Sequence, residues 1–97
     1  MRIWAKLLKD NRIIQETVRE YSSARPSDMK GWSVLLHDLC QDMDLCRPVL
    51  LNKHINDLIQ FSRVVFKPAD FIEPVDFDGL EIEIITEKKK NVSHSFI

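Results

Sequence analysis

The stretch DMKGWSVLLHDLCQDMDL, residues 28–45, decides how the chain folds, because it predicts a helix that is apolar on one side only. Ser27 or Asp28 is the expected N-cap, and Pro48 prevents continuation, so we expect a helix over residues 29–44. Its apolar residues recur at helical spacing and would form one stripe: Trp32, Leu35, Leu36, Leu39, Cys40 and Met43. The rest of the chain must supply an apolar surface for this stripe.

The composition is that of one small globular domain, with 97 residues, 44% of them hydrophobic and 30% charged. The 14 Lys and Arg residues nearly balance the 15 Asp and Glu residues, so net charge gives no general attraction to nucleic acid or an anionic membrane. No apolar run approaches the roughly 20 residues of a membrane span, and no signal peptide is evident. We expect Cys40 and Cys46 to be free thiols in a cytoplasmic protein with no membrane partner.

Residues 2–21, RIWAKLLKDNRIIQETVREY, fit either a helix or a β-hairpin that turns at Asp10-Asn11. We favour the hairpin, because β-branched and aromatic residues are frequent here and the turn dipeptide is centred. This hairpin pairs Leu8 with Ile13, Leu7 with Ile14, Trp4 with Thr17 and Ile3 with Val18. Alternation then puts Ile3, Leu7, Ile14 and Val18 on the face toward the helix, where Glu16 fits badly. The opposite face would carry Arg2, Trp4, Lys6, Leu8, Ile13, Gln15, Thr17 and Arg19.

The second half of the chain predicts one more helix and one more strand. Residues 47–51, RPVLL, read as an edge strand or an extended connection, and Asn52 as the N-cap of a helix whose apolar side carries Ile55, Leu58 and Ile59. Residues 64–66 continue as a brief extended piece. In residues 69–78 we expect Phe71 and Phe77 to attach an irregular segment to the core.

The last strand is expected over residues 80–86, where Leu80, Ile82 and Ile84 face inward and Glu81 and Glu83 face outward. Residues 87–97, with a lysine run, are expected to form a flexible tail. The prediction is therefore an α+β fold over residues 1–86, in which a small, mainly antiparallel sheet of the N-terminal hairpin and the C-terminal strand packs against two helices.

Three stretches together resemble a family of short, uncharacterised bacterial proteins: MRIWAKLLKDNRII at residues 1–14, LCQDMDLCRPVLL at residues 39–51 and DFIEPVDFDGLEIEII at residues 70–85. The resemblance covers most of residues 1–86. It implies a compact cytoplasmic domain. It implies no activity, cofactor or catalytic residue.

Two groups of side chains could hold a metal ion. His37, Cys40, Cys46 and His54 have the elements of a zinc site, but their spacing matches no common zinc module, so we favour core thiols and surface histidines. A group of acidic side chains could bind a hard cation or act in acid–base catalysis: Asp70, Glu73, Asp76, Asp78, Glu81 and Glu83. Part of the pattern of a calcium-binding loop is missing from this group. With only two glycines there is no phosphate-binding loop, and we expect no cofactor. We favour a role without catalysis, although the sequence leaves an enzyme open.

The outer face of the hairpin is the expected interaction face, formed by Arg2, Trp4, Lys6, Leu8, Ile13 and Arg19. A sheet that is apolar on both faces leaves one of them to be covered. The leading prediction is a small protein-interaction or regulatory module that dimerises through Trp4, Leu8 and Ile13. The alternative is a module that binds single-stranded nucleic acid with the cations and the tryptophan of this face.

Overall fold

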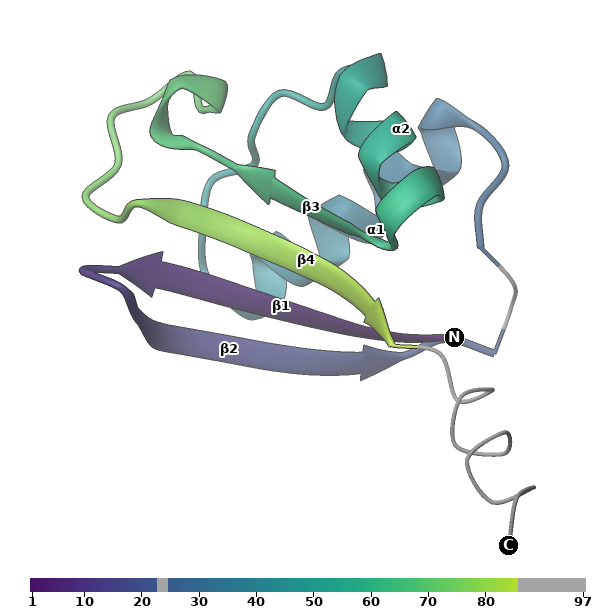
Figure 1. Ribbon diagram of the computed structural model, residues 1–97, viewed down its shortest axis with the longest axis horizontal. Helices are drawn as coiled ribbons and strands as arrows, with labels where there is room; N and C mark the ends of the chain where they lie inside the picture. Colours follow the sequence, from purple (N-terminus) through teal and green to yellow (C-terminus); the bar gives the residue numbers. More distant parts are fainter. Residues whose placement is uncertain (23–24, 86–97) are drawn as a thin grey trace, which may run out of the picture.

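The computed structural model describes residues 1–22 and 25–85, and it has the predicted α+β fold. A four-stranded antiparallel sheet in the order β2-β1-β4-β3 carries two helices on one side (Figure 1). The elements follow in the order β1 (Arg2–Lys9), β2 (Arg12–Glu20), α1 (Met29–Asp42), α2 (Asn52–Phe61), β3 (Arg63–Phe66), a 3-10 turn (Pro68–Asp70) and β4 (Gly79–Ile85). None of the helices in this part of the chain has the length and hydrophobicity that a bilayer crossing requires.

The N-terminal hairpin is confirmed, and its turn explains why the chain reverses at Asp10-Asn11. Both residues have positive φ angles, 52° and 63°, as a two-residue type I′ turn requires. Aspartate and asparagine tolerate this backbone better than most residues. Asp78, the residue before β4, also accepts the backbone N–H of Asp10 at 2.8 Å, so the turn is attached to the start of the neighbouring strand.

The predicted hairpin pairing is correct at the turn and wrong beyond it. Leu8 pairs with Ile13 as expected, but a β-bulge follows, and Leu7 then pairs with Gln15 instead of Ile14. A shift of one residue moves side chains to the opposite face of the sheet. The later predicted pairs are therefore replaced by Trp4 with Val18 and Ile3 with Arg19.

The bulge decides which residues of β2 meet the helices. Ile14 and Val18, predicted to be in the core, are 52% and 54% exposed. Gln15, whose partner Leu7 is buried, takes the helix side and donates to the backbone oxygen of Met43 at 3.1 Å. Glu16 moves to the opposite side and no longer conflicts with an apolar core.

The predicted stripe of α1 is confirmed, since all six of its residues are buried. The helix begins after Asp28, whose carboxylate accepts the N–H of Gly31 at 2.9 Å, and ends at Asp42, two residues earlier than predicted. Beyond it, Asp44 adopts a left-handed φ of 57°, and the N–H of Leu45 returns to the oxygen of Cys40 at 2.9 Å. The stripe packs against the sheet through one hydrophobic cluster that includes Ile3, Ala5, Leu7, Leu80, Ile82 and Ile84.

The second helix faces the core differently from the prediction. Leu58 is buried and Ile55 is partly buried, but Ile59 is 59% exposed, and His54 takes an inward position instead. Asn52 is the first helical residue and not the N-cap, which is Leu51. Residues 47–51 form no strand, whereas β3 is a true strand of the sheet, paired with β4. Phe71 and Phe77 are buried in edge-to-face contact, 5.2 Å between centroids, as expected of the residues that attach their segment.

The expected directions along β4 are also confirmed. Leu80, Ile82 and Ile84 are buried, while Glu81 and Glu83 alternate with them on the other side. Thr86 and the predicted tail, residues 87–97, lie outside the described residues. One side of the sheet thus carries the core, and the other carries no element of the described chain (Figure 1).

Candidate interaction surface

We define the open face as the side of the sheet opposite α1 and α2. Strand pairing aligns its residues in rows, since Trp4 lies between Val18 and Glu83, and Lys6 lies between Glu16 and Glu81. Its members are Arg2, Trp4, Lys6 and Leu8 of β1, Ile13, Glu16, Val18 and Glu20 of β2, Glu81, Glu83 and Ile85 of β4, and Arg63 and Val65 of β3.

Lys6 is at the centre of the open face and is almost completely covered. Its ammonium lies 3.9 Å from the centroid of the Trp4 ring, 2.9 Å from Glu83 Oε1 and 3.4 Å from Glu81 Oε2. Only 7% of the residue is exposed. A lysine is rarely this buried unless its charge has partners. Two carboxylates and an aromatic face satisfy this charge, so Lys6 stabilises the sheet and is not a free cation.

The other charged groups of the open face are paired as well. Arg63 Nε donates to Glu81 Oε2 at 2.7 Å, and Arg2 Nη2 donates to Glu20 Oε2 at 3.0 Å. Glu16 accepts the indole N–H of Trp4 at 2.7 Å. The charges therefore form a network within the face, between exposed apolar residues such as Val18.

A hollow of about 700 Å³ lies on the β2 side of the open face. Val18, Trp4 and Ile85 form its apolar part, and two carboxylates and the Arg2 guanidinium lie beside them. Its lining is Arg2, Trp4, Glu16, Val18, Glu20 and Ile85. An apolar surface between carboxylates suits a cation with an aliphatic stem, such as the side chain of arginine.

One predicted member of the interaction face is elsewhere. Because of the bulge, Arg19 points to the helix side, where its Nε lies 2.9 Å from Asp42 Oδ2 and its Nη1 lies 3.3 Å from Asp38 Oδ2. The other five predicted residues are on the open face. The sequence did not indicate Val18, Glu81, Glu83 and Arg63 as members, since their place depends on the bulge and on strand order.

The four metal candidates are not brought together. His37 and Cys40 line one depression beside the end of α1, Cys46 lines another, and His54 is buried in α2. In the part of the chain that the structure describes, no group of three or more His, Cys, Asp or Glu side chains is placed to hold a metal ion. Burial also raises the pKa of the Cys40 thiol to about 11, so a metal ion would displace its proton less readily than that of an ordinary thiol.

The acidic group is likewise divided among separate contacts. Asp78 accepts the N–H of Asp10, and Glu81 and Glu83 pair with Lys6. Asp70 accepts the N–H of Lys67 at 2.9 Å and lies 3.5 Å from His54 Nε2. These carboxylates therefore have structural partners.

His54 was predicted to be a surface residue and is in fact 2% exposed. Its Nδ1 accepts the N–H of Leu51 at 2.9 Å, and its ring lies 4.5 Å from that of Phe66. The imidazole thus ties the start of α2 to β3 and the 3-10 turn. A histidine three residues after the N-cap was the available signal, since this position can reach back to the cap N–H.

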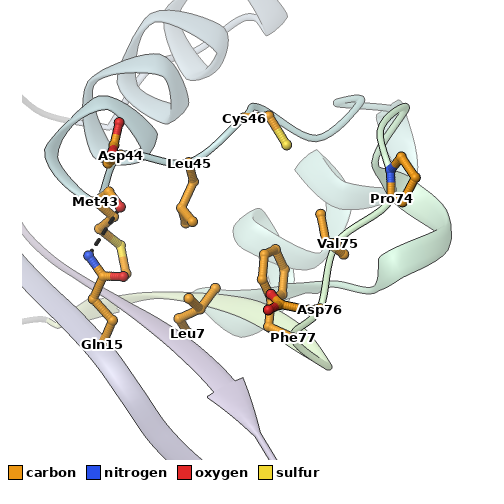
Figure 2. A pocket seen from close by; sticks show the side chains of 10 residues that line it. All are labelled: Leu7, Gln15, Met43, Asp44, Leu45, Cys46, Pro74, Val75, Asp76 and Phe77. Atoms are coloured by element: carbon orange, nitrogen blue, oxygen red, sulfur yellow. Dashed lines mark hydrogen bonds between the residues drawn. The ribbon is translucent and has the colours of Figure 1, made fainter.

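A second hollow, of about 770 Å³, lies between the end of α1, the hairpin and residues 74–77 (Figure 2). Leu7 and Leu45 point toward each other across it, and Val75 and Phe77 line the opposite part. Cys46, which we expected to be a core thiol, is exposed and lies at its rim. No local pattern indicates this hollow, because its lining residues come from four separate segments.

Comparison with protein-family models, with curated proteins and with solved structures finds no match. The similarity to short bacterial proteins therefore stays a prediction. Function has to be inferred from the surface of the molecule.

Proposed function

We propose that the protein is a small interaction module that associates with itself through the open face of its sheet. The observation that carries this proposal is the pairing of charges within an otherwise apolar surface. Burying an unpaired charge is costly, whereas Lys6, Arg63 and their glutamates already hold partners. Another protein can therefore cover this face at a smaller desolvation penalty than it would pay on a face with unpaired charges.

Exposed apolar residues support the same proposal. Val18 and Ile13 are 54% and 46% exposed, and Trp4, Leu8 and Ile85 lie beside them on the open face. An antiparallel sheet with one solvated face usually carries polar residues there. The apolar side chains of this face come from four neighbouring strands and form a patch of the kind that another protein covers.

The alternative, binding of single-stranded nucleic acid, needs free cations next to an exposed ring. On the open face the cations Arg2, Lys6 and Arg63 all contact carboxylates. The charges therefore favour a protein partner. Cytoplasmic location remains an expectation, with which the free thiols Cys40 and Cys46 are compatible.

Sedimentation velocity over a range from low micromolar to near-millimolar protein tests the proposal. We expect concentration-dependent dimerisation that Val18→Lys abolishes, because it places a charge on the apolar part of the hollow. Val34→Lys is the matched control, since Val34 of α1 is 58% exposed but lies outside the open face. A wild-type protein that remains monomeric at the highest concentration would contradict the proposal.

The same variants test the nucleic-acid alternative. Val18→Lys adds a cation to the open face, so it should strengthen the binding of a labelled oligonucleotide at low salt if this face binds nucleic acid. We expect flat fluorescence anisotropy for both the wild type and the variant.

A further inference from the structure

The charges of the open face form columns of alternating sign along the strands. β2 carries Glu16 and Glu20, and β1 carries Arg2 and Lys6. β4 carries Glu81 and Glu83, and β3 carries Arg63. In the spatial order β2-β1-β4-β3 the sign is therefore negative, positive, negative, positive.

This order makes the face complementary to itself for one symmetry only. A twofold axis that lies between two stacked sheets, parallel to their strands, reverses the strand order, so β2 faces β3 and β1 faces β4. Each column then meets a column of opposite sign. A twofold axis across the strands would place each column against its own copy, and like charges would repel.

We infer that the partner of the open face is a second copy of this chain, related by a twofold axis parallel to the strands, with Arg63 of each copy seated in the hollow of the other. This inference rests on the proposed function and specifies its geometry. The kind of interface is isologous, as in most dimers.

The alignment of the rows places Arg63 of one copy opposite the hollow of the other. Arg63 is level with Glu83, Glu83 with Trp4, and Trp4 with Val18. Rotation about the axis therefore brings Arg63 of one copy over Val18 of the other, between Glu16 and Glu20. Packed sheets lie about 10 Å apart and nearly aligned, a gap that an arginine from one side and short side chains from the other can fill.

The chemistry of both sides fits this contact. The Arg63 side chain is 55% exposed, and only its Nε is used by Glu81, so its terminal nitrogens can donate to another carboxylate. Glu16 and Glu20 each use one oxygen in the contacts described above and keep acceptor capacity. In the same arrangement Glu83 of one copy lies over Trp4 of the other, between Arg2 and Lys6.

Charge reversal in two complementary variants tests the geometry. A dimer has two equivalent contacts between residue 63 and the hollow. In a dimer of Arg63→Glu, both contacts place a glutamate against Glu16 and Glu20. In a dimer of Glu16→Lys/Glu20→Lys, both contacts place Arg63 against two lysines. We expect each variant alone to dimerise about 100-fold more weakly than the wild type. A mixture should form a heterodimer of near wild-type stability, because both contacts then join opposite charges. Native mass spectrometry detects the heterodimer, and sedimentation velocity measures its stability.

The controls separate geometry from folding and from the proposed function. Far-UV circular dichroism melts check that each variant is folded, and the milder Arg63→Gln should weaken dimerisation about tenfold if a reversed variant does not fold. Lys53→Glu, an exposed charge reversal on α2, should leave dimerisation unchanged. If Val18→Lys blocks dimerisation but the reversed variants dimerise normally, or do not form a heterodimer when mixed, the twofold geometry is wrong and the proposed function stands. A monomeric wild type overturns both.

Discussion

Arg19 of β2 and Asp42 of α1 form an ion pair in which Nε lies 2.9 Å from Oδ2. Asp38, one helical turn earlier, lies 3.3 Å from Nη1 of the same guanidinium. The edge strand β2 is thus joined to α1 through one arginine that contacts two carboxylates. This contact exists only because the bulge turns Arg19 toward α1.

We predict that Arg19→Ala lowers the free energy of unfolding slightly, since both partners are partly exposed and water screens the attraction. Urea denaturation monitored by tryptophan fluorescence measures this change. A double-mutant cycle with Asp42→Ala should give a coupling energy that falls as salt is added. The control is Arg12→Ala, at an exposed position of β2 for which the described residues show no ion pair. An equal loss in Arg12→Ala would refute the role of the helix contact.

Much of this fold could be predicted because its signals are local. The stripe of α1, the Asp10-Asn11 turn and the alternation of β4 each depend on spacing within one segment. The bulge does not depend on spacing within one segment. Ile14 could face either side of the sheet, and the observed register goes with the hydrogen bond that Gln15 donates to the backbone oxygen of Met43, in a distant segment. One extra residue then changes the face of the remaining strand.

The candidate surface shows the same division. Trp4, Leu8 and Ile13 were predicted together because alternation and the turn relate them directly. Arg63 and Glu81 were not, because they join this face only when β3 and β4 take their places beside β1. The alternation of charge across the four strands depends on strand order, and strand order cannot be predicted from any one segment.

The two cysteines should differ strongly in reactivity. Cys40 is buried with a pKa raised to about 11, mainly by removal from water, whereas Cys46 is exposed. We predict that iodoacetamide at pH 8 modifies Cys46 first and that Cys40 reacts only after unfolding. Peptide mass spectrometry with and without urea identifies the modified residue. Rapid modification of Cys40 in the folded protein would contradict its placement.

The raised pKa of Cys40 also sets a direction for stability. Its folded pKa of about 11 lies above the ordinary value of 9.0, so folding favours the protonated thiol. The stabilising effect is complete below pH 9.0 and is lost as pH rises through about 11. Cys40→Ala should therefore show a smaller fall in melting temperature over this alkaline range than the wild type does, and equal falls would indicate that Cys40 ionises freely.

His54 should carry its proton on Nε2. Its Nδ1 accepts the N–H of Leu51 at 2.9 Å and so must be unprotonated, which leaves Nε2 to face Asp70 at 3.5 Å. Long-range proton–nitrogen correlation spectra at neutral pH distinguish the two tautomers. A proton found on Nδ1 would exclude the Leu51 contact.

Loss of this side chain should open the junction between α2, β3 and the 3-10 turn. We predict that His54→Ala lowers the free energy of unfolding by about 2–4 kcal/mol, because it leaves a cavity beside Phe66 and an unpaired N–H at Leu51. His37→Ala is the matched control, at an exposed position of α1, and should change stability by less than about 0.5 kcal/mol. Chemical denaturation of both variants makes the comparison, and similar losses would show that the buried imidazole has no special role at this junction.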